Sequence, residues 1–327
     1  TVDIERAIDQ MAGTFSLNLA SKARTGAEDW PIAAGAECIV ILGGVPLITG
    51  YIDSVSRFLS ADQRGIEVRG RDRTADLVDC SAIHKSGSWR GRKLEQIAAE
   101  LVQPFGIPIE VAADTGAPFK RFALQPGETV FAAIERMCRY RGLVLWSPGN
   151  GAVRIGDPDS GLSIGQLTEG DNVLQASGVR DQSERFSDYI VKGQASGDDE
   201  RSGATVAQVK GEAKDANVAR YRPLLIVGEE QSDRASLEQR AQWEAAVRSG
   251  RATPARITVP GWFTQAGVPF AHGNRASCNV PSAAIEGELL IERLRFVRDA
   301  ERGSLTSFDL VPPEAWTQLP QPEPRVS

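Results

Sequence analysis

Residues 47–72 have the sequence LITGYIDSVSRFLSADQRGIEVRGRD, which carries the pattern of two strands joined by a turn. Leu47 to Phe58 is a long run rich in β-branched and aromatic residues, and Gly65 to Arg69 alternates apolar and charged side chains. The segment between them, Ala61 to Gly65, is polar and ends in glycine, which is typical of a chain reversal. The stretch therefore predicts an antiparallel hairpin.

The residues before this hairpin continue the antiparallel pattern. Phe15 to Leu19 alternates, and Cys38 to Leu42 is a short apolar run that predicts a buried strand. Gly43-Gly44 supplies the positive φ that a tight turn into the next strand requires. We therefore expect residues 1–86 to form a first small antiparallel β-barrel.

The hydrophobic period becomes helical after residue 86. Leu94, Ile97 and Leu101 fall on one helical face, and a second helix is expected from Thr129 to about Arg141, with Gly142 as its C-terminal stop. A hairpin around Pro148-Gly149-Asn150-Gly151 follows. Residues 87–157 are predicted to form a small α/β domain.

The second half of the chain returns to strands, interrupted by a charged helix that we expect at residues 232–249. Its predicted division is a polar linker at 158–172, a second β-barrel at 173–200 and 251–312, a loop and helix-bearing segment at 201–250, and an extended proline-rich tail at 313–327. The predicted fold class is α+β and multidomain, with two related small antiparallel β-barrels, a small α/β domain and a helix-bearing segment.

A short internal echo links the two predicted barrels. Arg57-Phe58, followed by Arg64-Gly65, is matched at the same internal spacing by Arg295-Phe296, followed by Arg302-Gly303. Each copy lies between two apolar strands, so we infer a duplicated β unit. Three such chains would present six similar faces around a ring, which is a physical way to join a sixfold tube to a threefold object.

A set of separate motifs resembles the phage Mu baseplate hub (tail) protein family. These motifs are Gly50-Tyr51-Ile52-Asp53, the stretch GRDRTADLVDCS at 70–81, Arg240-Ala241-Gln242-Trp243-Glu244, Val259-Pro260-Gly261-Trp262, Glu288-Leu289-Leu290-Ile291, and the stretch LVPPEAW at 310–316. The resemblance covers nearly the whole chain, and the order and spacing of the pieces make it specific.

The resemblance implies a structural virion protein of a contractile tail baseplate, similar to the central hub of T-even phages and assembled in the host cytoplasm. It implies a homotrimeric ring between the tail tube protein and the central spike protein, in contact with other baseplate proteins. DNA would pass through its channel only in transit during ejection.

Charge and composition argue against several other classes of protein. The net charge is −6, with acidic and basic residues interspersed, which does not favour tight nucleic-acid binding. No apolar run approaches the length of a membrane-spanning helix. The four cysteines form no C-x-x-C pair, and His84 and His272 lie outside any metal-ligand motif, so we expect no metal and no cofactor.

One acidic cluster admits a catalytic alternative. Asp72, Asp76 and Asp79, near Arg71 and Arg73, are a possible carboxylate set for hydrolysis or a divalent cation. Asp72 and Asp76 are four residues apart, and on a helix they would share a face and pair with the arginines, which favours a structural or interface role. We therefore expect no catalytic residue, and a cell-wall hydrolase stays the alternative.

A second alternative is a peptidoglycan-binding module of the tail tip. Trp89 and Trp146 in the α/β domain are candidates for stacking on sugar rings, although packing between domains is the favoured role. For contacts between subunits, the candidates are Arg57, Phe58, Arg71, Arg73, Asp76, Arg295 and Phe296.

Overall fold

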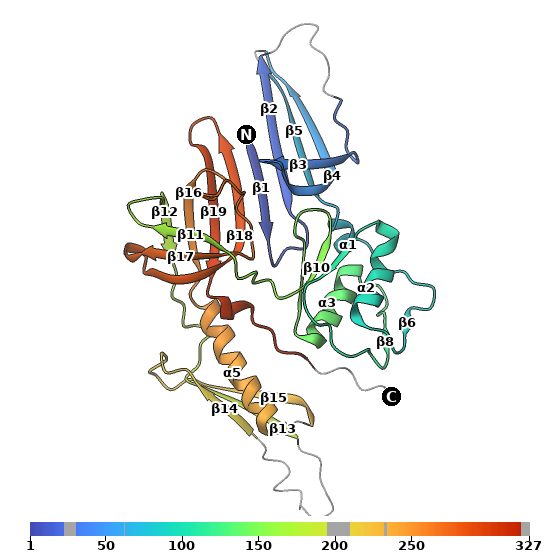
Figure 1. The fold of residues 1–327 in the computed structure, drawn as a ribbon, viewed down its shortest axis with the longest axis vertical. Coiled ribbons are helices and arrows are strands. Elements are labelled where there is room, and N and C mark those ends of the chain that lie inside the picture. The colour runs from blue at the N-terminus through green and yellow to red at the C-terminus, as the bar shows by residue number, and fades with distance from the viewer. Residues whose placement is uncertain (23–30, 62, 195–209, 232–233, 322–327) are drawn as a thin grey trace, which may run out of the picture.

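The computed structural model describes residues 1–22, 31–61, 63–194, 210–231 and 234–321 (Figure 1). Its first β unit, at the top of Figure 1, contains β1 (Val2–Ala7), β2 (Thr14–Lys22), β3 (Glu37–Leu42), β4 (Val45–Leu59), β5 (Gln63–Asp72) and the short helix α1 (Ala75–Asp79). The predicted hairpin of residues 47–72 is confirmed, because β4 and β5 pair antiparallel along their length.

The α/β unit follows and packs its helices together. It contains β6 (Ser88–Trp89), α2 (Leu94–Val102), a 3₁₀ turn η1 (Gln103–Phe105), β7 (Ile109–Val111), β8 (Phe122–Ala123), α3 (Val130–Arg141), β9 (Val144–Trp146) and β10 (Val153–Gly156). The Thr129 hydroxyl accepts a hydrogen bond from the Ala132 amide at the start of α3, and Gly142 ends it with φ +64°, as the sequence predicts. β7, β10 and β9 form a small sheet.

The second β unit is assembled from two stretches of chain. It contains β11 (Ser163–Thr168), β12 (Gln175–Gly178), β16 (Ala255–Pro260), β17 (Arg275–Val280), the turn η2 (Pro281–Ala283), β18 (Ile285–Asp299) and β19 (Gly303–Val311), followed by η3 (Pro313–Trp316). The expected linker therefore contains β11, which pairs parallel with β17.

The helix-bearing unit, at the bottom of Figure 1, is inserted between β12 and β16. It contains β13 (Asp188–Gln194), β14 (Lys210–Lys214), β15 (Pro223–Gln231) and the helix α5 (Arg234–Arg251). β13 was expected in the second barrel, but it lies between β14 and β15 because its side chains Tyr189 and Val191 pack against α5. The first residues of the expected loop and helix-bearing segment, 201–209, lie outside the described residues, and β14 begins directly after them.

The two β units share one hydrogen-bonded sheet. Its strand order is β12-β16-β19-β18-β1-β2-β5-β4-β3, and β17 and β11 branch from β18. The join is β1, which pairs with β18 over six residues on one edge and with β2 on the other. Among the described strands the ladders close no barrel, so the fold is α+β with a dominant open sheet.

A three-strand pattern occurs once in each β unit. β3 and β17 have six residues each, and β4 and β18 have 15 residues each. In both units the first strand pairs with the start of the long strand. The third strand pairs with the other edge of the long strand on both sides of a bulge, which follows Ile52 in β4 and Ile291 in β18. The common order, the equal lengths of the first two strands and a bulge near the middle of each long strand support a duplication, as the sequence echo suggested.

A single apolar core lies under both β units. Ile4 and Phe15 from the first unit join Leu294, Phe296 and Phe308 from the second. The α/β unit has its own core, onto which Met11 and Leu77 of the first unit also pack. The units are therefore packed against one another through apolar side chains, which fixes the candidate surfaces described below. No described helix is long and apolar enough to cross a membrane.

Candidate assembly surfaces

A ladder of ion pairs covers the solvent face of the shared sheet. Arg256 on β16 forms a bidentate pair with Asp309 on β19, at 2.6 and 3.1 Å. Arg293 on β18 reaches Glu5 on β1 at 3.1 Å and Asp9 at 3.0 Å. The face is polar because period-two alternation places these residues opposite the buried core residues of the same strands.

Arg295 extends this ladder toward the first β unit. Its guanidinium forms a bidentate pair with Asp3, with Nε 2.7 Å from Oδ1. The hydrogen bond to Asp3 raises the pKa of Arg295, and the bond to Asp309 raises the pKa of Arg256. Three arginines face four carboxylates, so this face has little positive charge left to bind phosphates.

Arg71 and Asp76 lie in a second charged group at the end of β5. Arg71 donates to Asp53 at 2.7 Å and to Asp79 at 2.8 Å. Burial and the neighbouring Asp79 raise the pKa of Asp76. Within the described residues, no group of three or more His, Cys, Asp or Glu side chains is arranged to hold a metal ion. Arg71 thus holds Asp53 and Asp79 by hydrogen bonds and acts on Asp76 through its charge, an arrangement that suits a structural role.

Asp72 does not share a helical face with Asp76, contrary to the sequence prediction. Asp72 is the last residue of β5, still in register with Gly50, and α1 begins only at Ala75. Its side chain is buried and accepts hydrogen bonds from the amide and hydroxyl of Thr74. The strand ladder overrides the helical spacing, so the proposed carboxylate cluster is divided between two environments.

Asp72 belongs instead to a buried polar junction where three units meet. Burial lowers the pKa of Arg6 to about 10, opposed by the charge of Asp72, while burial raises the pKa of Asp72. The α/β unit approaches at Gly149, where a Cβ atom would lie 2.6 Å from the Arg6 guanidinium carbon. Only glycine fits this contact.

His272 brings the second β unit to the same junction. Its Nε2 lies 3.1 Å from the Ser147 carbonyl oxygen, and its ring is buried. Burial, with the charge of Arg6, lowers the pKa of His272 well below its usual value. The neutral imidazole of His272 therefore acts as a packing residue here.

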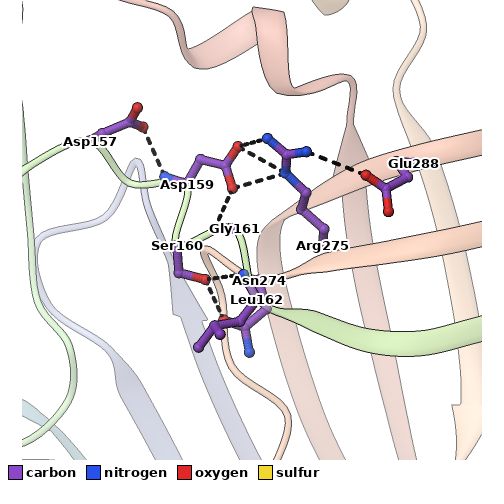
Figure 2. Close-up of polar contacts among 8 residues, drawn as sticks. All are labelled: Asp157, Asp159, Ser160, Gly161, Leu162, Asn274, Arg275 and Glu288. Atoms are coloured by element: carbon purple, nitrogen blue, oxygen red, sulfur yellow. Dashed lines mark hydrogen bonds and ion pairs between the residues drawn. The ribbon is translucent and has the colours of Figure 1, made fainter.

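A polar clamp holds the chain between the α/β unit and β11 (Figure 2). Asp159 pairs with the Arg275 guanidinium, and the Ser160 hydroxyl donates to Asn274 at 2.8 Å. The backbone adds Ser160 N–H to the Gly273 carbonyl at 2.8 Å. Burial raises the pKa of Asp159, but the Arg275 hydrogen bond and a bond from the Gly161 amide outweigh it, so the pKa is lowered. The segment expected as a linker is thus fastened to β17.

Both candidate sugar-stacking tryptophans are buried. Trp89 is 6% exposed and Trp146 is 5% exposed. Trp89 donates its indole N–H to Glu100 at 2.6 Å and lies 4.5 Å from the His84 ring, centroid to centroid. Neither indole face is open to a glycan.

The remaining interface candidates fall in different environments. Phe58 is 49% exposed at the end of β4, and Arg57 donates to the Ile32 carbonyl. Arg73 packs against Gly151 of the α/β unit. Phe296 is fully buried in the shared core, 6.0 Å from the Trp262 ring, so its prediction as a surface contact is wrong.

The echo failed at Phe296 because its two copies are out of register by one residue. Counted from the first residue beyond each bulge, Ser54 and Arg293, Phe58 is four positions along and Phe296 is three. A shift of one residue moves a strand side chain to the opposite face. Equal spacing in sequence therefore placed one phenylalanine outside and the other in the core.

The sequence also missed exposed apolar side chains on two strands. Cys38 to Leu42 was expected to be buried, but Ile39 and Ile41 are each 59% exposed because only one face of β3 meets the core. On β15, Leu225 is 54% and Val227 is 73% exposed. Burial in β3 alternates with period two, but its sequence is a continuous apolar run, so the sequence carries no alternation that would reveal the exposed face.

Four families match successive parts of the chain. They are the Mu phage baseplate assembly protein GpP-like N-terminal domain (residues 1–72), the baseplate hub protein gp44-like second domain (74–157), the tail protein NMB1110-like third domain (185–243), and the Mu phage baseplate assembly protein GpP fourth domain (233–319). Together they cover most of the chain.

Similar individual proteins span almost its whole length. The baseplate hub protein gp44 of Escherichia phage Mu is 32% identical over 325 residues, 97% of this chain and 85% of that protein. The structure of the 43 kDa tail protein of prophage MuSo2 from Shewanella oneidensis has a TM-score of 0.86 at 32% identity, covering 97% and 95% of the two chains. A tail protein from Neisseria meningitidis MC58 has a TM-score of 0.77 at 23% identity, covering 97% and 93%.

Proposed function

Because this chain belongs to the family of Mu-like phage baseplate hub proteins, a structural component of the tail in the virion, we propose that three copies form a ring between the tail tube and the central spike. Other baseplate proteins contact the outside of this ring, and DNA passes through it during ejection. Assembly takes place in the host cytoplasm, before the tail is complete.

The observation that carries the proposal is the repeated three-strand pattern. β3-β4-β5 and β17-β18-β19 share their pairing order, the lengths of their first two strands and a bulge near the middle of the long strand, all within one shared sheet. Three copies then carry six similar β units, which suits a ring that meets a sixfold tube on one side and a threefold spike on the other. A chain without the repeat offers no such match of symmetry.

The ion-paired sheet face supports a channel through which DNA passes without being tightly bound. Arg256, Arg293 and Arg295 are each held by carboxylates of the same chain. Phosphates can bind there only if these ion pairs are broken, so the free energy of binding the DNA backbone to this face is small. The buried tryptophans and the arginine-paired aspartates give the cell-wall hydrolase and the peptidoglycan-binding module no support.

Light scattering coupled to size exclusion tests the ring directly. The expected mass is three times the chain mass of 35.2 kDa, constant over a wide range of protein concentration. A mass of one chain at every concentration, both alone and with the purified tube and spike proteins, would overturn the proposal. Negative-stain images of the trimer should show a closed annulus.

A further inference from the structure

The repeat allows the two β units to be aligned residue by residue. Each long strand has a first residue beyond its bulge, and the hydrogen-bonded neighbours of that residue can be followed outward across the sheet. In the first unit the path runs from β4 through β5 and β2 to β1, ending at Asp3. In the second it runs from β18 through β19 and β16 to β12, ending at Ser177.

β12 is therefore the counterpart of β1. Asp3 and Ser177 occupy the same place, three strands away from Ser54 and Arg293 respectively. β12 itself has four residues. Hydrogen bonds from the Leu174 amide to Thr258 in β16 and from the Val179 amide to Pro254, just before β16, extend the paired stretch to six residues, the length of β1. The two strands thus have equal length and overlap in position, with residues 176–179 corresponding to residues 2–5.

The counterparts differ in what lies on their outer edge. The outer edge of β1 pairs antiparallel with the part of β18 that follows its bulge. β17 pairs with the same edge of β18, in the part that precedes the bulge. The equivalent edge of β4 carries β3 up to Tyr51 and the backbone of Gly35 and Ala36 at Ile52, and no described strand pairs with it farther along. β12 likewise pairs with β16 alone in the described chain.

We propose, resting on the ring proposed above, that β12 of one copy pairs antiparallel with β4 of the next copy, in the register that β1 and β18 use within one chain. Asp3 faces Val297 and Glu5 faces Arg295 in that internal pair. Transferred through the repeat, Ser177 faces Phe58 and Val179 faces Ser56 of the neighbouring copy. The contact joins different edges of the two copies, so it is heterologous, which is the type of contact that repeats around a ring of three copies.

The exposed side chains on the two edges fit this pairing. Leu59 is 79% and Phe58 is 49% exposed at the end of β4. Leu174 and Val179, which flank β12, are 57% and 52% exposed. An apolar strand edge left open invites pairing with another chain, and natural sheets cover such edges. A second copy covers both edges at once, because each copy carries one of each.

Cysteine pairs test the register in the full-length chain. The double variant Ser56→Cys/Val179→Cys, made with the exposed Cys80→Ser, places two thiols opposite each other across the contact, within the range of a disulfide. Mild oxidation is expected to produce linked dimers and closed trimers on a denaturing gel. The matched control is Glu5→Cys/Arg295→Cys with the same Cys80→Ser change, the equivalent pair within one chain, which should lose two free thiols on oxidation without any gain in mass.

The single variants define the direction of the contact. Ser56→Cys alone and Val179→Cys alone should stay unlinked, whereas an equal mixture of the two should yield dimers and nothing larger. Links in Ser56→Cys alone overturn the heterologous pairing. An absence of links in the double variant also overturns this inference. Light scattering on the same sample then separates the two proposals. A trimeric mass refutes this strand contact but supports the ring, whereas a monomeric mass refutes both.

Discussion

Truncating the two phenylalanines of the sequence echo should have very different effects on stability. Phe296 is completely buried between both β units and contacts Trp262, so Phe296→Ala is expected to cost about 3–5 kcal/mol of unfolding free energy. Phe58 is 49% exposed. Half of the roughly 1.5–3 kcal/mol for burying such a side chain predicts a cost of about 1 kcal/mol for Phe58→Ala.

Urea unfolding followed by tryptophan fluorescence measures both costs, since Trp262 lies next to Phe296 and its indole N–H donates to the Leu305 carbonyl at 3.0 Å. Dilute protein is used, and a second concentration checks that association does not add to the Phe58 value. Equal losses for the two variants would refute the argument that a one-residue offset places one ring outside and the other in the core.

Three further predictions concern the contacts between units. Burial lowers the pKa of His272, so below about pH 6.5 the unfolded state binds a proton that the folded state does not, and the free energy of unfolding should fall as the pH drops. In urea titrations between pH 7 and pH 5, His272→Gln should show a smaller decrease in the free energy of unfolding. Asp159→Ala removes one of the two charged partners of Arg275, the other being Glu288, and should cost about 1–3 kcal/mol, with faster amide hydrogen exchange at Gly161 and no change in α3. Gly211→Ala places a Cβ atom 2.1 Å from the Leu237 carbonyl carbon and should detach α5 from β14, lowering the melting temperature, whereas the exposed neighbour change Glu212→Ala should leave it within a degree or so.

Local signals were sufficient for the helices and for several turns. The start of α3 at Thr129 and its end at Gly142 follow from side-chain capping and from the left-handed conformation of glycine, which depend only on nearby residues. The hairpin at 47–72 is equally local, because its strands are neighbours in sequence. The family motifs also lie in the sequence, so the hub family could be recognised before any contact was known.

The second β unit was harder to delimit. The polar composition of 158–172 indicated a linker, but β11 pairs with β17, more than 100 residues later, and Asp159 is held by Arg275. β13 resembled the other strands and was assigned to the wrong sheet, because its partners are chosen by packing on α5. The composition of a strand does not determine which sheet it joins.

The sequence by itself determined the class of fold and the family, since these follow from periodicity and from motifs along the chain, and its short echo suggested a duplicated β unit. Only the tertiary structure decided which face and which edge of each strand is open. Phe296 is buried and Ile39 is exposed because of strands that pair from distant parts of the chain, and β1 joins β18 across almost the whole sequence. A strand has two faces and two edges, and the segments that cover them are selected by the packing of the complete chain.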